Sequence, residues 1–285
     1  MRFASRAAIA AMLVFAPLSA AVAQNAGKTL AMDFRMTSSV QGMPDTGVIM
    51  GHAVGTTDKM RLDLAMKGAA AKVTPIADSA VIMIVTDSGQ TVTYLDSKNT
   101  QYLRVRPAEM VAQAQKTGDM KMDFSETSAK VDSLGAGPAI LGHPTSHYRV
   151  TTGMTISISA MGQQQTVKIA SSNDAYYAND IKGYLNPFTT LTGGDMSGIF
   201  GTSNKDFGEK MKAVKDKLPK GTPLRALSTA TIVAQGQTRV TNSVAEVTGI
   251  QWINTDPKTF EVPANYTAKQ LPGIGGASSG AIPPK

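Results

Sequence analysis

Large apolar and polar residues alternate along several short segments of this sequence. In residues 30–36 the even positions are Leu, Met, Phe and Met, while Asp33 and Arg35 stand between them, and residues 60–67 repeat this pattern. A period of two places successive side chains on opposite faces of a β-strand. Each segment therefore has one apolar face and one face that tolerates water, which is typical of a half-buried strand in an antiparallel sheet.

Turn residues bound the other strands that we expect. Asp, Gly, Ser and Asn interrupt the apolar segments at intervals, and Gln235-Gly236 suits a tight hairpin. The remaining predicted strands are residues 47–55, 80–85, 91–95, 100–105, 120–124, 146–152, 154–160, 165–170, 175–179, 224–235, 238–248 and 259–262. The sequence thus predicts a mainly β (α+β) fold built as a meander of antiparallel strands.

Two helices are expected within this succession of strands. Residues 107–115 begin with a proline at a first-turn position, and residues 204–218 place Phe207, Met211 and Val214 on one side. An amphipathic helix among strands needs a sheet face to cover. Its other side is rich in lysine, which is typical of a solvated face and, alternatively, of contact with anionic lipid.

The N-terminus has the features of a secretory signal peptide. Two arginines precede an apolar stretch, and Ala21-Val22-Ala23 forms a small-x-small cleavage site. Residues 1–23 are therefore expected to be removed, which leaves no transmembrane segment and predicts a soluble, exported, periplasmic protein. The signal carries 2 of 28 basic residues, so the mature chain has 26 basic and 21 acidic residues, a net charge of +5. This charge is too low to indicate a nucleic-acid partner.

The mature chain is expected to form one domain over residues 24–268. Residues 186–202 contain four glycines and one proline and predict a flexible loop, either a lid or a linker. Residues 269–285 are rich in Gly, Ser and Pro and predict a disordered tail.

No catalytic or metal-binding signature is visible in the sequence. The chain has no cysteine, which excludes disulfides, thiol nucleophiles and Cys-ligated metals. Its three histidines are His52, His143 and His147, and Pro144 and Thr145 favour an extended chain that would hold the last two too far apart to share a metal. We therefore assign no catalytic residues, metal or cofactor.

Methionine is unusually frequent, with 16 residues in the whole chain. Thioether side chains are flexible, so a sheet face rich in methionine can pack around apolar guests of varied shape or simply fill a core. Both alternatives stay open. The residues expected to line such a cavity are Met32, Phe34, Met36, Met50, Met60, Leu62, Leu64, Met66, Met122, Phe124, Phe207 and Met211.

Four short motifs resemble a family of exported bacterial proteins related to the Lol-type (LolA/LolB-like) lipoprotein carriers. They lie at residues 140–150, 174–180, 221–224 and 259–266. The resemblance spans about residues 28–270 and implies a curved antiparallel half-barrel whose concave face is covered by two or three helices. It implies no catalytic or ligand residues.

These expectations lead to two functional hypotheses, while a third, an enzyme, is disfavoured because no His, Ser or carboxylate constellation is visible. The first is a non-enzymatic periplasmic carrier that holds a lipid, an acyl chain or a lipoprotein anchor in the sheet cavity. Removing the ligand's apolar surface from water would stabilise the complex by about 25 cal/mol per Å². The alternative is a cell-envelope interaction or structural protein with a packed interior. An apolar ligand is the partner in the first hypothesis and an envelope protein is the partner in the second.

Overall fold

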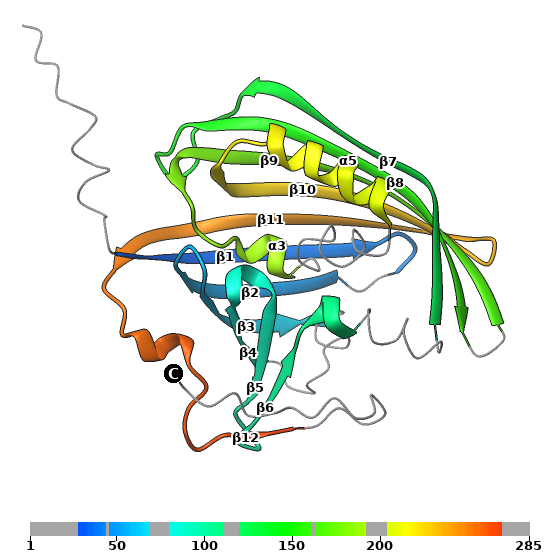
Figure 1. The fold of residues 1–285 in the computed structure, drawn as a ribbon. Coiled ribbons are helices and arrows are strands. Elements are labelled where there is room, and N and C mark those ends of the chain that lie inside the picture. The colour runs from blue at the N-terminus through cyan, green and yellow to red at the C-terminus, as the bar shows by residue number, and fades with distance from the viewer. Residues whose placement is uncertain are drawn as a thin grey trace, which may run out of the picture.

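A computed structural model describes residues 28–43, 46–68, 80–110, 120–160, 163–191 and 204–269. These residues form one large β-sheet with the helices α3 and α5 on one side of it (Figure 1). The predicted mainly β class is confirmed. The signal peptide (1–23) and the tail beyond Lys269 lie outside the described residues, as do residues 111–115 of the first predicted helix.

Twelve strands build the sheet. They are β1 (Thr29–Val40), β2 (Thr46–Gly55), β3 (Met60–Lys67), β4 (Ala80–Thr86), β5 (Thr91–Asp96), β6 (Gln101–Val105), β7 (Met120–Ala136), β8 (Thr145–Ala160), β9 (Gln163–Lys182), β10 (Gly221–Ala234), β11 (Gln237–Ile253) and β12 (Thr267–Ala268). Among the described residues, the named helical elements are η2 (Asp87–Gly89), α3 (Pro187–Leu191), α5 (Lys205–Lys217) and η3 (Pro257–Phe260), and residues 107–110 are also helical.

The strand order places the first strand beside the last long strand in the middle of the sheet. It runs β12-β6-β5-β4-β3-β2-β1-β11-β10-β9-β8-β7, and every pair except β12–β6 is antiparallel. Strand β1 thus pairs with β11, the last long strand. Among the described residues β7 and β12 are the outermost strands and do not pair with each other, so the sheet is open.

The strand register defines two faces, which we call inner and outer. The inner face carries Phe34, which packs against Phe188 of α3 with ring centroids 5.7 Å apart. The same face continues through β11 and β10 to Ile169 and Met154, and Phe207 of α5 packs there. Both helices therefore lie on the inner face, as Figure 1 shows.

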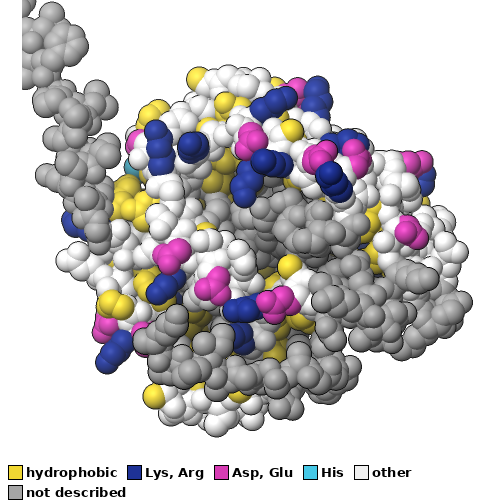
Figure 2. Space-filling view, in the orientation of Figure 1, with side chains coloured by type: hydrophobic (Ala, Val, Ile, Leu, Met, Phe, Trp, Pro, Cys, Tyr) yellow, Lys and Arg dark blue, Asp and Glu magenta, His cyan; other side chains and the backbone are white. Residues whose placement is uncertain are grey.

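Helix α5 forms where the sequence predicts it. Asn204 is its N-cap, and its side chain accepts a hydrogen bond from the Phe207 amide N–H at 2.8 Å. Phe207 and Val214 are buried, while Lys210 pairs with Asp206 at 2.7 Å on the exposed side. Basic and acidic side chains mingle over this part of the surface (Figure 2), which fits a solvated face.

Several predicted boundaries need correction. The segments 146–152 and 154–160 are one strand, β8, because Gly153 continues the ladder opposite Ala170. The segments 165–170 and 175–179 likewise belong to one strand, β9. Residues 259–262 are not a strand: Asp256 caps the Lys258 amide N–H, and Pro257 begins the short helix η3.

The predicted loop 186–202 is also not loop throughout. Residues 187–191 form helix α3, because the Asn186 side chain accepts hydrogen bonds from the amide N–H groups of Phe188 and Thr189. Residues 192–202 lie outside the described residues.

Candidate functional site

Most of the predicted lining residues meet in one cluster on the inner face of β1 to β3. Its members from the prediction are Met32, Phe34, Met60, Leu62, Leu64 and Met66, each at most 6% exposed, with Met36 half-buried against them. Phe188 of α3 belongs to the same cluster. The alternating sequence pattern therefore assigned these side chains to a shared face, and here the face is closely packed.

A second group of predicted residues lies beneath α5. Phe207 is buried with Met154 and Ile156, and Phe124 and Met211 pack against them half-buried. Met122 is half-buried on β7 opposite Ile158. This cluster is separate from the first one, so the predicted lining residues occupy two parts of the inner face.

Met50 does not share a face with the other predicted residues. Its register partner on β1 is Arg35, and it is 42% exposed on the outer face. Gly51 takes the inner position instead, opposite Phe34. The segment Val48-Ile49-Met50 is apolar throughout, so alternation could not assign its faces.

Between the two clusters lies a strip of inner-face side chains that the sequence analysis did not single out. This inner strip consists of Ile169, Ser171 and Asn173 on β9, Ala226, Ser228, Ala230 and Ile232 on β10, and Thr241 and Ser243 on β11. All of them are half-buried. Most are small, and a signal for them was present in the alternating Ala226-x-Ser228-x-Ala230 pattern, which lacks the large residues that usually mark a core.

Hydrogen bonds satisfy some of the polar side chains of this strip. The Ser228 hydroxyl donates to the Asn173 side-chain oxygen at 2.9 Å, and the Ser171 and Thr152 hydroxyls lie 2.7 Å apart. Further along β9, burial raises the pKa of Tyr177, whose ring packs edge-on against Tyr148, to about 12. The inner strip therefore presents apolar side chains at Ile169 and Ile232 and hydroxyl groups at its centre.

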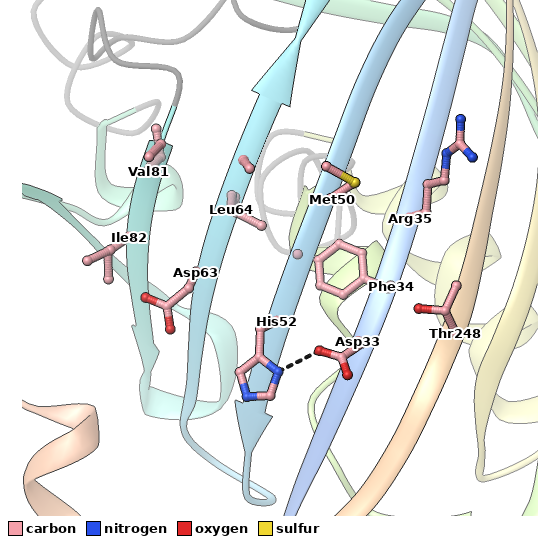
Figure 3. A pocket seen from close by; sticks show the side chains of 13 residues that line it. Asp33, Phe34, Arg35, Met50, His52, Asp63, Leu64, Val81, Ile82 and Thr248 are labelled. Carbon is pink, nitrogen blue, oxygen red and sulfur yellow. Dashed lines mark hydrogen bonds and ion pairs between the residues drawn. The ribbon is translucent and has the colours of Figure 1, made fainter.

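The outer face carries a separate hollow of about 640 Å³ over β1 to β4. Asp33, His52 and Asp63 line one side of it in a row across three strands (Figure 3), and His52 Nδ1 lies 2.7 Å from Asp33 Oδ1. Arg35 and Met50 stand on the other side. The hollow is open, and the His52 and Asp33 side chains are 47% and 60% exposed.

Each of the other two histidines lies beside a different aspartate. His143 Nδ1 is 2.7 Å from Asp180, while His147 stacks on the Tyr176 ring at 4.3 Å with Nε2 3.6 Å from Asp174. Hydrogen bonds from Arg149 lower the pKa of Asp174. Within the described ranges no three acidic or histidine side chains come together as a metal site would require.

Comparisons with known proteins add little to this geometry. No protein-family model matches the chain, and no curated protein sequence matches it. Among solved structures, the chain is similar to PNGF-II at a TM-score of 0.34 and 14% identity, over 85% of this chain and 31% of that one. The chain thus spans about a third of that structure's length. Of the helices that the structure describes, none has the length and apolar character to traverse a bilayer.

Proposed function

We propose that this chain is a non-enzymatic periplasmic binding or carrier protein for an apolar ligand such as a lipid, an acyl chain or a lipoprotein anchor. The observation that carries the proposal is the inner strip, whose small side chains lie half-buried between two apolar clusters. In this proposal the open sheet acts as a half-barrel, and α3 and α5 cover its concave face.

Small side chains on a sheet face leave room above the backbone. At the inner strip, Ala226, Ser228 and Ala230 stand where the neighbouring cluster on β1 to β3 has Met, Leu and Phe. A ligand chain bound on the inner strip would be stabilised by about 25 cal/mol for each Å² of apolar surface removed from water. The hydroxyls of Ser171 and Ser228 would then face the ligand's polar end.

Among the described elements, helix α3 packs on the larger apolar cluster. It has five residues and holds the cluster chiefly through Phe188, which is 5% exposed. A long acyl chain that extends from the inner strip toward Phe34 would take the place of Phe188. The predicted lining residues of β1 to β3 would in this way join the binding surface.

The periplasmic assignment depends on the sequence. Residues 1–23 have the charge, apolar stretch and cleavage site of a signal peptide, and a chain without cysteine needs no disulfide for stability in an oxidising compartment. N-terminal sequencing of the chain recovered from a periplasmic extract would support this assignment if Gln24 is its first residue.

Ligand binding is tested with the mature chain, residues 24–285, and a fluorescent fatty acid. Ala230→Trp fills the inner strip and is expected to weaken binding about tenfold or more, a change of about 1.4 kcal/mol. Thr229→Trp is the matched control, since Thr229 directly precedes Ala230 on β10 and is exposed on the outer face. Equal affinity of the two variants, or no binding by the unsubstituted chain, would contradict the proposal.

One observation favours the alternative, a cell-envelope interaction or structural protein with a packed interior. Met32, Met60 and Leu62 are at most 1% exposed, so the methionine-rich face is a filled core in this conformation. Mass spectrometry of the purified mature chain separates the two functions: co-purified lipid supports the carrier, and a ligand-free chain that binds no fatty acid supports the alternative.

A further inference from the structure

The outer edge of β7 carries a regular stretch of strand. Strand β7 pairs with β8 on one side and with no described strand on the other. Irregularities in its register lie between Ser125 and Ser128 and between Ser133 and Gly135, so residues 128–133 form a regular segment between them. A regular unpaired edge presents backbone N–H and C=O groups on which another strand can pair.

The backbone just before this stretch is capped by a side chain of α5. Just before it, Lys210 Nζ of α5 donates to the Thr127 carbonyl oxygen at 2.9 Å, so that acceptor is already used. Within residues 128–133 the only ion pair among the described residues joins Lys130 and Asp132 at 2.9 Å, with the lysine side chain 73% exposed. Among the described residues no strand pairs with this part of the edge.

The residues of this stretch are self-complementary when two copies run antiparallel. If Val131 faces Val131 of a second copy, then Lys130 faces Asp132 of that copy and Ala129 faces Ser133. Opposite charges directly across two strands contribute about 0.2–1 kcal/mol, and like charges oppose pairing. Centring the pair on Lys130 or on Asp132 would set like charges against each other, and only a pair centred on Val131 sets Lys130 opposite Asp132, so the charges favour Val131 as the centre.

We infer that the chain forms a symmetric dimer in which the β7 edges of two copies pair antiparallel about Val131. An isologous contact uses each β7 edge once, so it closes at two copies. The opposite edge of the sheet is partly occupied, because β12 pairs with β6 at Gln101 and Tyr102. A contact of one short strand is small, which predicts a weak dimer.

The absence of native cysteine makes the contact directly testable. Val131→Cys places a single thiol opposite its own copy, at a Cα separation of about 4.5–5.5 Å that a disulfide can bridge. Thr229→Cys is the control, because Thr229 is exposed on an internal strand. At about 100 μM, a concentration suited to a weak interface, Val131→Cys is expected to crosslink at least about tenfold faster under mild oxidation; equal rates would overturn the inference.

Charge reversal tests the register separately. In the Val131→Cys background, Lys130→Glu or Asp132→Lys alone sets like charges across both ends of the contact and should slow crosslinking about tenfold. The double substitution restores opposite charges and should restore the rate. The Lys130 side chain is exposed and Asp132 is half-buried opposite Arg149, so circular dichroism checks that each variant keeps its fold. A double variant as slow as the single ones would overturn the inference, and neither result bears on ligand binding.

Discussion

Gly51→Ala is expected to destabilise the domain, although alanine usually favours a strand over glycine. A Cβ atom at Gly51 would lie 2.2 Å from Phe34 Cζ and less than 3 Å from both Cε atoms of the ring. The ring has little freedom to move, because Phe34 is 2% exposed and Phe188 packs edge-on against it. The substitution therefore forces the core to shift.

Two effects of opposite sign decide the magnitude. Replacing glycine in a strand gains about 0.5–1 kcal/mol of chain entropy, while overpacking a rigid core costs about 1–3 kcal/mol. The expected net loss is about 1–2 kcal/mol. Gly55→Ala, on the same strand, is the matched control, because its added Cβ would find its nearest neighbour at an ordinary 3.6 Å and should stabilise instead.

Urea unfolding followed by circular dichroism measures both changes through the midpoint at constant slope. Phe34→Leu supplies the decisive background, since leucine lacks the ring atoms that the new methyl group would meet. There, Gly51→Ala should cost little or nothing. The reasoning would be refuted if Gly51→Ala stabilised the wild-type chain or cost the same in both backgrounds.

Three further predictions follow from the described contacts. Leu64→Asp should unfold the domain by placing a charge in the core, whereas Ala65→Asp on the exposed outer face should be tolerated; similar thermal melts would reverse the assigned faces. Asn204→Ala removes the N-cap of α5 and should lower stability by about 1 kcal/mol in urea, and an unchanged midpoint would mean that the cap contributes nothing. Because Arg149 holds the pKa of Asp174 below 3.8, this stabilisation is present at neutral pH and lost as the pH falls through the lowered pKa. Arg149→Gln should therefore reduce the urea midpoint at pH 7 but not at low pH, and a pH-independent reduction would contradict this linkage.

The sequence by itself was sufficient where the pattern is local. Alternation in residues 30–36 and 60–67 identified both the strands and their buried faces, and Leu30, Met32, Leu62 and Leu64 are indeed buried. Helix α5 was predictable for the same reason, since its apolar spacing depends only on residues within the helix.

Only the tertiary structure decided the features that depend on distant parts of the chain. Met50 faces outward because Gly51 must fit beneath the Phe34 ring of a neighbouring strand, a contact that the apolar segment around it does not encode. The inner strip arises because β11 returns to pair with β1, which sets the small residues of β10 between two clusters of large ones. Periodicity specifies which side chains share a face within a strand, but pairing between strands far apart in the sequence specifies which faces become neighbours.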